Sequence, residues 1–234
     1  MADREDDPPE LHAARRGRTA RVGELEAAYV SALLAADEIA AEIAIREAME
    51  AGLGAAEISE LIVAPALWQV GELWQRGEIS VADEHVATEI SIRVLALQHE
   101  AQRVARARGR HRVLLAAPAG ERHVVALRMV GNLLSAAGYS IVMLGADVPA
   151  DALVACVRRY EPDVICLTLT MPLLAGQMLN SIVHVQAARP ATRFVVGGRG
   201  LSVQLRSRPG VEFCARVSDA VESVDASVKR AALN

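Results

Sequence analysis

Cysteine and aromatic residues are scarce in this chain of 234 residues. Aromatic residues make up only 3% of it, so a core must consist mainly of Ala, Leu, Val and Ile. The three cysteines, Cys156, Cys166 and Cys214, form no CxxC pair. This scatter favours small core thiols in a reducing compartment over a disulfide framework or a zinc site. Each of the two tryptophans therefore needs an explanation.

Long apolar runs and a strong excess of one charge are also missing. No run of about 18 apolar residues occurs, and the charged N-terminus lacks the apolar segment of a signal peptide. We therefore expect a cytoplasmic protein without a membrane partner. The formal net charge of −4 and the pI of about 5.9 give no electrostatic reason for direct binding to nucleic acid.

Signatures of catalysis are missing as well. The chain has no nucleophile elbow with a Ser-His-Asp order and no paired metal-ligand spacing. A mutase would need a substrate-binding barrel, for which the chain has no segment. We therefore expect a protein that is not an enzyme.

The first half of the chain has a helical pattern. Residues 1–20 are charged and contain Pro8-Pro9, which predicts a disordered tail. Residues 21–108 predict a four-helix bundle, because apolar residues recur at helical spacing and the connections are short. The expected helices cover 22–35, 37–51, 56–76 and 80–108. Pro65 should kink or break the third of them.

The second half, residues 109–234, alternates strands and helices. This pattern predicts an α/β domain with a flavodoxin-like or Rossmann-like, five-stranded parallel sheet. Strands are expected at 112–117, 140–144, 163–169, 193–197 and 211–215. Helices are expected at 122–137, 149–160, 174–188, 200–207 and 218–231.

The loop after the first strand carries Glu121, Arg122 and His123. Ligands of open α/β sheets bind beyond the carboxyl ends of the strands, so His123 is placed to meet one. A metal-bound imidazole usually donates its other N–H to a carboxylate, a role that Glu121 suits. One histidine cannot hold a bare metal ion, but it can be an axial ligand of a metal in a macrocycle. A solvated loop histidine is the alternative.

Two further strand ends complete this candidate site. The third strand ends in Thr168-Leu169-Thr170, whose hydroxyls are candidates to extend the Glu121–His123 relay. The fourth ends in Gly197-Gly198, which lets something approach the backbone closely or simply makes a turn.

The helical half offers a second group of candidates. Trp74 lies at the end of the third expected helix, and Glu84 and His85 lie in the first turns of the fourth. The tight turn at Gly77 should bring these side chains to one end of the bundle. Trp68 lies about 240° around the helix from Trp74, so the two indoles cannot face one ligand. A core tryptophan and a surface Glu-His pair are the alternatives.

The segment Trp74-x9-Glu84-His85 resembles the W-x9-EH motif of light-sensing cobalamin-binding domains of the CarH/LitR type. The second half resembles the B12-binding fold, whose signature is D-x-H-x-x-G, then S-x-L, then G-G. These appear here as Glu121-x-His123-x-x-Ala126, Thr168-Leu169-Thr170 and Gly197-Gly198. The resemblance covers residues 21–234.

The resemblance implies a cobalamin, such as adenosylcobalamin, held base-off/His-on between the bundle and the sheet. His123 would be the lower axial ligand of cobalt. The nucleotide tail would pass Thr168, Thr170 and the two glycines, Trp74 would cover the upper face, and Glu84 and His85 would lie near the upper ligand. Light would then break the cobalt–carbon bond and change the bundle and the oligomeric state.

Three residues depart from the family pattern. Glu121 replaces Asp, and Ala126 replaces Gly. Gln75 stands where relatives have a histidine that ligates cobalt after photolysis, so water or His85 would take that position here. The MerR-type DNA-binding domain of the family is missing, so we expect action through a separate effector protein or a homo-oligomer.

The photocobilin branch of the family binds biliverdin beside the corrinoid, so biliverdin stays open as a second chromophore. Two other functions also remain open. One is a corrinoid carrier for a methyltransferase, which shares the lower histidine and the two-part layout. The other is a flavodoxin-like binding domain without any corrinoid.

Overall fold

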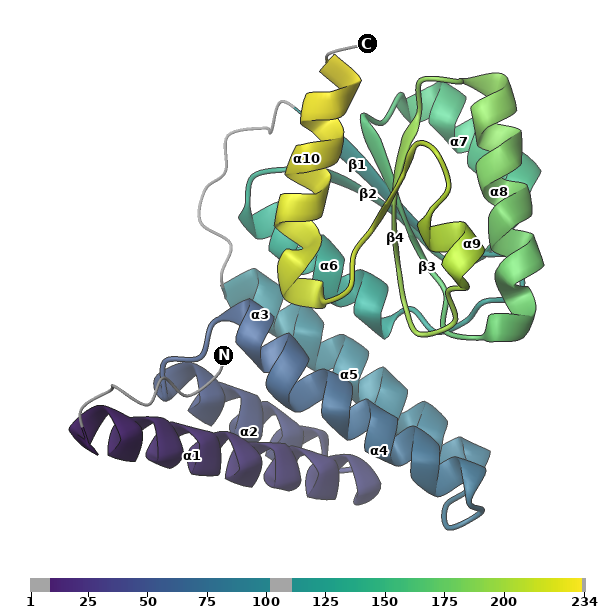
Figure 1. Ribbon diagram of the computed structural model, residues 1–234. Helices are drawn as coiled ribbons and strands as arrows, with labels where there is room; N and C mark the ends of the chain where they lie inside the picture. The colour runs from purple at the N-terminus through teal and green to yellow at the C-terminus, as the bar shows by residue number, and fades with distance from the viewer. Residues whose placement is uncertain (1–8, 102–110, 233–234) are drawn as a thin grey trace. The chain divides into compact units, whose positions relative to one another are not determined.

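The computed structural model describes residues 9–101 and 111–232. The chain divides into two compact units, Met1–Val94 and Leu95–Asn234. The expected tail over residues 1–8 and the end of the helix expected over 80–108 lie outside the described residues. Figure 1 shows the helices of the first unit and the sheet with its helices in the second.

The first unit is helical, as the apolar spacing predicts. In chain order, it contains α1 (Pro9–Leu34), α2 (Glu38–Glu50), α3 (Ala55–Ile58), a π-helical turn (Ser59–Val63), α4 (Ala64–Gln75) and the start of α5 (Val81–Ala101). The segments α3, π turn and α4 follow one another without a break and form the third expected helix. The π turn explains how Pro65 is accommodated, since the N–H of Ala64 reaches back to the carbonyl of Ser59 just before the proline.

Helix α1 starts earlier than expected. It begins at Pro9, so residues 9–20 are helical where the composition predicts a disordered tail. Proline suits the first turn of a helix, because its missing N–H has no partner there in any case. Two arginines tie this region to the rest of the unit: Arg18 pairs with Glu57 at 2.6 Å and Arg21 with Glu47 at 2.7 Å.

The second unit contains a five-stranded parallel sheet of order β2-β1-β3-β4-β5. Its strands are β1 (Arg112–Pro118), β2 (Ser140–Val148), β3 (Val164–Thr168), β4 (Arg193–Gly197) and β5 (Val211–Phe213). Its helices are α6 (Val125–Ala136), α7 (Ala150–Tyr160), α8 (Ala175–Ala188), α9 (Val203–Arg206) and α10 (Ala220–Ala232). The expected fold class, a helical domain followed by a Rossmann-like parallel sheet, is confirmed.

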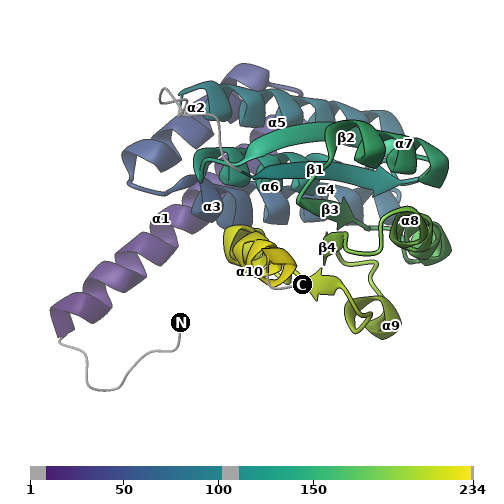
Figure 2. The same ribbon diagram turned by 90° about the horizontal axis from the view of Figure 1, so that it is seen from above.

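The alternation of side chains along β1 builds a core on each face of the sheet. Val113 and Leu115 pack on one face with residues of α6 and α10, while Leu114 packs on the other with residues of α7 and α8. Figures 1 and 2 show these helix pairs on opposite sides of the strands. Because all strands run in parallel, their carboxyl ends meet at one edge, which presents the loops that follow β1, β3 and β4.

Several element boundaries differ from those expected, and β2 ends at Val148 rather than at residue 144. Helix α6 begins at Val125 rather than at residue 122, which leaves His123 in the loop. Helix α9 is one short turn, and β5 has only three residues. The helix expected over 200–207 is too long because Ser202 caps α9, its Oγ accepting from the N–H of Leu205, so the helix starts at Val203.

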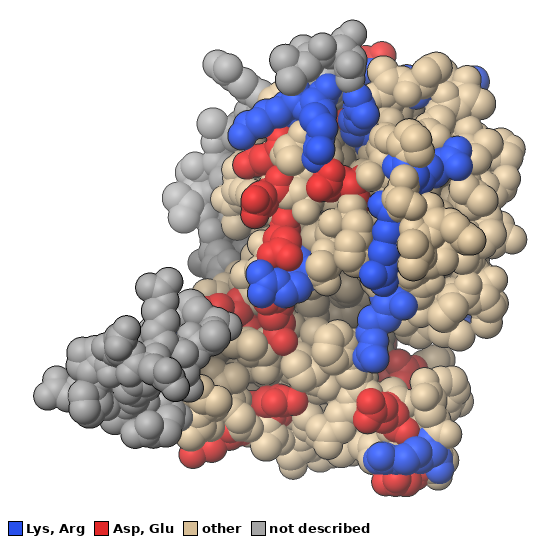
Figure 3. All heavy atoms as spheres, in the orientation of Figure 1, with Lys and Arg blue, Asp and Glu red and all other residues tan. Residues whose placement is uncertain are grey.

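The surface carries ion pairs between acidic and basic side chains. Arg216 pairs with Asp219 at 2.9 Å, and Arg76 pairs with Glu78 at 2.7 Å. On the face drawn in Figure 3, acidic and basic side chains are interspersed, with a row of basic side chains along the sheet unit. Within the described ranges, no helix has both the length and the apolar character that a membrane span requires.

A buried hydroxyl pair in the helical unit generates a stability prediction. Tyr29 on α1 is fully buried and donates to Ser91 Oγ on α5 at 3.1 Å, and Ser91 donates to the carbonyl of Ala87 at 2.9 Å. Burial raises the pKa of Tyr29 to about 12, although the bond to Ser91 opposes this. The neutral phenol is therefore the form that packs in this core at neutral pH.

We expect Tyr29→Phe to lower the free energy of unfolding by about 1 kcal/mol, because Ser91 keeps its bond to Ala87. Tyr29→Ala should cost about 3 to 5 kcal/mol, because it also leaves a cavity. Urea unfolding followed by tryptophan fluorescence measures both changes, since Trp68 and Trp74 both lie in this unit. Equal losses in the two variants would contradict the small contribution of the hydroxyl.

Candidate functional site

The loop after β1 is held by a tight turn and by the end of β2. The N–H of Glu121 donates to the carbonyl of Pro118 at 2.9 Å, and Gly120 has a φ of +82°, as the third residue of a type II turn requires. The N–H of Gly120 donates to Asp147 Oδ1 at 2.7 Å, and the N–H of Asp147 donates to the carbonyl of Glu121 at 2.9 Å. The backbone on either side of Glu121 is therefore fixed before its side chain is considered.

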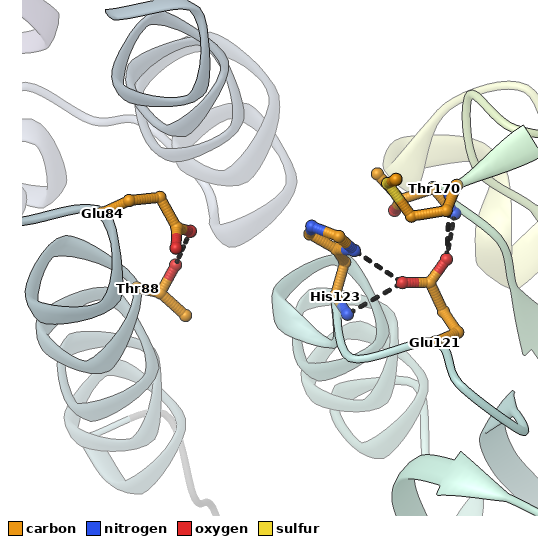
Figure 4. Close-up of polar contacts among 6 residues, drawn as sticks. Glu84, Thr88, Glu121, His123 and Thr170 are labelled. Atoms are coloured by element: carbon orange, nitrogen blue, oxygen red, sulfur yellow. Dashed lines mark hydrogen bonds and ion pairs between the residues drawn. The ribbon is translucent and has the colours of Figure 1, made fainter. Parts of the chain in front are cut away.

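The carboxylate of Glu121 is fully buried and accepts four hydrogen bonds (Figure 4). Its Oε1 accepts from His123 Nδ1 at 2.6 Å and from the N–H of His123 at 3.0 Å. Its Oε2 accepts from the N–H groups of Thr170 at 2.7 Å and Met171 at 2.9 Å. A buried charge is costly unless it is paired and hydrogen-bonded, and here both oxygens are saturated.

These contacts keep Glu121 ionised. Burial by itself would raise the pKa of the carboxyl group, but the bonds from the His123 ring, Met171, the His123 N–H and Thr170 together lower the pKa to about 2. Glu121 is therefore a carboxylate throughout the physiological pH range, and it acts as the acceptor for the Nδ1–H of His123.

His123 is thereby prepared as a ligand. Its Nδ1 faces Glu121, and half of its side-chain surface is exposed. With the proton on Nδ1, the lone pair lies on Nε2, on the opposite side of the ring. No group of three or more His, Cys, Asp or Glu residues in the described part of the chain could hold a metal ion. A single imidazole of this kind could serve as one axial ligand of a metal that a macrocycle already holds.

The glycines after β4 pack against the chain itself. Gly198 has a φ of +110°, and a Cβ there would lie 2.2 Å from the carbonyl oxygen of Leu169. A Cβ on Gly200 would lie 2.9 Å from the carbonyl carbon and oxygen of Thr170. Of the two alternatives expected at Gly197-Gly198, a close approach or a simple turn, Gly198 shows a close approach, which is made by the β3–α8 loop that supplies the N–H donors to Glu121.

The turn between α4 and α5 connects Trp74 to the Glu84–His85 pair, which together are the second group of candidate site residues. The N–H of Gly77, whose φ is +73°, donates to the carbonyl of Trp74 at 2.9 Å, and the N–H of Glu78 donates to that of Leu73 at 2.9 Å. This pair of bonds is a Schellman motif. Helix α5 starts with a reciprocal cap, in which the N–H of Ser80 donates to Asp83 at 2.8 Å and the N–H of Asp83 donates to Ser80 at 3.3 Å.

Trp74 is not a core residue. Its side chain lies in the last turn of α4, where Gln75 follows it, and 44% of the residue is exposed. Trp68 is 51% exposed, so neither indole is buried in the helical core. A large apolar surface of Trp74 is therefore open to solvent in this unit.

Glu84 and His85 form a second carboxylate–imidazole pair. His85 Nδ1 lies 2.6 Å from Glu84 Oε2. Thr88 Oγ1 donates to Glu84 Oε1 at 2.9 Å, as Figure 4 shows. The His85 side chain is 72% exposed, whereas that of Glu84 is 23% exposed. With a proton on Nδ1, the lone pair of His85 would lie on Nε2, as for His123.

The structure brings some expected residues together and adds others. Glu121, His123 and Thr170 meet, but Thr170 contributes its backbone N–H. Arg122 is exposed in the loop, and Thr168 is buried at the end of β3, in register with Gly197. Sequence reasoning missed four residues that shape these sites: Met171, Asp147, Gly200 and Thr88. Thr88 had a sequence signal, since it stands four residues after Glu84.

Comparison with known proteins identifies related domains in both units. One sequence model of a B12 binding domain matches residues 111–224, and a second model, also described as a B12 binding domain, matches residues 25–97. The chain is 26% identical over 201 residues to the trimethylamine corrinoid protein of Methanosarcina barkeri, which covers 82% of this chain and 90% of the relative.

Two further relatives match different shares of this chain. The chain is 31% identical over 130 residues to the HTH-type transcriptional repressor CarH of Myxococcus xanthus, which covers 55% of this chain but only 42% of the repressor. The solved structure of the monomethylamine corrinoid protein of Methanosarcina barkeri superposes with a TM-score of 0.71 at 17% identity. That match covers 89% of this chain and 99% of that one, and it supports the fold.

The lowered pKa of Glu121 generates a prediction for the ligand-free protein. A carboxyl group whose pKa falls from 4.5 to about 2 on folding adds stability above pH 4.5, and this stability is lost as the pH falls towards 2. Glu121→Gln should therefore lower the free energy of unfolding by roughly 2 to 3 kcal/mol at pH 7 and by less at pH 3.

Urea unfolding at both pH values, followed by the amide NMR signals of β1 and β3, measures this effect. Glu212→Gln is the matched control, because Glu212 is a surface carboxylate of the same unit that pairs with Arg230. It should change the stability by at most about 1 kcal/mol. A loss in Glu121→Gln that is the same at pH 7 and pH 3 would contradict the assigned ionisation.

Proposed function

We propose that this chain binds a cobalamin base-off/His-on through His123 and senses light through it; the matches to two models of B12 binding domains support the cofactor. The observation that carries cobalamin binding is the Glu121–His123 contact, in which a buried carboxylate with four hydrogen bonds holds a half-exposed imidazole, with Nε2 as the proposed ligand nitrogen. The choice of a sensor over a carrier depends on Trp74, Glu84 and His85 at the proposed upper face. The Glu121–His123 contact is the arrangement that fixes the tautomer and raises the basicity of a metal-bound histidine.

The residues present fit a corrinoid better than a bare metal ion. A corrin ring supplies four nitrogen ligands itself and needs a single imidazole from the protein, which the loop after β1 offers. That loop lies at the carboxyl edge of a parallel sheet, where ligands of this architecture bind. Thr168, Thr170, Gly197 and Gly198 follow neighbouring strands at the same edge and would line the path of the nucleotide tail.

In the helical unit, we propose that Trp74 covers the upper face of the corrin and that Glu84 and His85 lie beside the upper ligand. The exposed indole supplies an apolar surface that excludes water. Glu84 is held by Thr88 and in turn holds His85. Because the amide of Gln75 is a poor cobalt ligand, the Nε2 of His85 or water would occupy the upper position after photolysis.

When bound, adenosylcobalamin would supply a cobalt–carbon bond that light breaks. The protein residues would hold the ring from below, shield it from above and respond to the loss of the upper group. Residues near that group belong to α4 and α5, whose ends are fixed by the Schellman motif and the Ser80–Asp83 cap. We propose that this response changes the oligomeric state or the contact with a separate effector protein.

A corrinoid carrier for a methyltransferase is the second candidate function. The observation in its favour is the share of this chain that each relative matches. The trimethylamine corrinoid protein matches 82% of the chain, whereas CarH matches 55%. Both functions need His123 and Glu121. They differ at the upper face, which a carrier must open to its partner enzyme and a sensor must protect.

Absorption spectra of the purified chain with adenosylcobalamin, recorded before and after illumination, test the proposal. We expect a His-on spectrum that changes irreversibly in light. His123→Ala should lose that spectrum and bind at least about tenfold more weakly, because the axial ligand is missing. His184→Ala is the control, since His184 lies exposed on α8 and bonds to the carbonyl of Asn180.

The other outcomes of this experiment assign the alternatives. A bound corrinoid that ignores light, together with methyl transfer from methylcobalamin by a methyltransferase, would support the carrier. An unchanged spectrum in His123→Ala would reject the ligand assignment. A red absorption band after the addition of biliverdin would show a second chromophore.

A pair of matched tryptophan variants tests whether Trp74 covers the upper face of the corrin. Trp74→Ala should speed the displacement of the upper ligand by cyanide in the dark and leave the His-on spectrum intact, because only the upper face loses protection. Trp68→Ala, in the same helix, should change neither. If Trp74→Ala only lowers the unfolding midpoint, the indole acts through packing and the proposed cover is wrong.

A further inference from the structure

Two glycines after β4 clamp the β3–α8 loop in the sheet unit. We call Gly198 and Gly200, together with the backbone they touch at residues 169–171, the glycine clamp. The N–H of Leu169 donates to the carbonyl of Gly197 at 3.0 Å, and the N–H of Gly200 donates to the carbonyl of Leu169 at 2.9 Å. A Cβ on Gly198 or Gly200 would come within 3.0 Å of this backbone, so neither position has room for a side chain.

The clamped backbone is the segment that holds Glu121. The N–H groups of Thr170 and Met171 follow directly after Leu169, and both donate to Glu121 Oε2. The other oxygen, Oε1, accepts from the ring of His123. One continuous series of short contacts therefore runs from Gly200 through the loop backbone and the Glu121 carboxylate to the imidazole.

We propose that Gly200 is a positioning residue for His123. Gly200 does not touch the imidazole, but it lets the loop come close enough for two N–H groups to fix the carboxylate, and the carboxylate fixes the ring. This inference rests on the proposed function, because it takes His123 to be the ligand of cobalt. It adds to that function a residue outside the family-like motif residues and a structural reason for its identity.

Gly200 is a sharper test position than Gly198. Gly198 has a φ of +110°, so any side chain there is strained in itself, and its Cβ would meet Leu169 O at 2.2 Å. Gly200 has no positive φ, and its added Cβ would meet only the loop backbone, at 2.9 to 3.0 Å. Gly200→Ala therefore displaces the loop by a small amount without another source of backbone strain.

Gly176→Ala is a matched control. Gly176 belongs to the same unit, lies in the first turn of α8 and has open space where the Cβ would be added. The two variants make the same chemical change at a glycine and differ in whether the new methyl group meets the clamp. Alanine in a helix interior is favourable relative to glycine, so the control should fold at least as well as the parent chain.

The first readout is the imidazole of His123 in the ligand-free full chain, observed by ¹⁵N and ¹H NMR at neutral pH. The parent chain and Gly176→Ala should show a proton on Nδ1 that is hydrogen-bonded to Glu121. In Gly200→Ala we expect this signal to weaken and the other tautomer to become populated. Affinity for adenosylcobalamin should fall by about tenfold, the lower end of the effect of disturbing the partner of a metal-bound histidine.

An unchanged His123 ring signal in Gly200→Ala would overturn the inference, even if the variant is less stable, because the clamp would then serve packing alone. The ring is read without corrinoid, so the two proposals fail separately. A parent chain that binds no corrinoid would reject the proposed function, whereas the ring signals would still report whether the clamp positions His123.

A second measurement covers the case in which Gly200→Ala does not fold. Coupling between two positions is reciprocal, so loosening the carboxylate must also loosen the clamp. In Glu121→Gln we expect faster amide hydrogen exchange at Thr170 and Met171 and also at Gly200, with no change in the amides of β5. Faster exchange at Thr170 and Met171 alone would show that the clamp is independent of the carboxylate and would overturn the inference.

Discussion

The buried carboxylate of Glu121 joins three parts of the sheet unit that are distant in sequence. It holds the His123 ring after β1 and accepts two backbone N–H groups after β3, which the glycines after β4 keep in place. A charge without solvent is tolerated only where every acceptor site is filled, so the loops must keep this arrangement for the unit to remain stable. The same requirement fixes the imidazole, which links the stability of the loops to ligand binding.

How far the sequence predicts this site depends on whether side chains or backbone groups make the contacts. Side-chain identity carries a signal, and Glu121 and His123 stand out because a carboxylate two residues from an imidazole is a known second-sphere arrangement. Backbone donors carry no such signal, since any residue except proline has an N–H. Met171 and the N–H of Thr170 could therefore not be predicted, and Gly200 differs from an ordinary turn glycine only through its neighbours in space.

More of the helical unit can be predicted from short stretches of sequence. A glycine after the last turn of α4 and a Ser80–Asp83 pair before α5 are sequence signals for ends that the structure confirms as a Schellman motif and a reciprocal cap. The start of α1 shows the opposite case. Its charged, proline-containing sequence predicts a tail, but Pro9 fits the first helical turn, and Arg18 gains a partner in Glu57, 39 residues away. Such distant pairings have no local pattern.

The exposure of Trp74 bears on the choice between a sensor and a carrier. In a chain with 3% aromatic residues, a large apolar side chain that is 44% exposed contributes little to folding for its size. Trp68 is equally exposed, so exposure alone does not distinguish a cover from a surface residue. Trp74 differs in its surroundings, because its carbonyl is fixed by the Schellman motif and the Glu84–His85 pair begins the next helix. Because this turn joins the two helix ends that carry Trp74 and His85, the proposed cover suits a sensor, which must guard its upper ligand, better than a carrier, which must deliver that ligand to an enzyme.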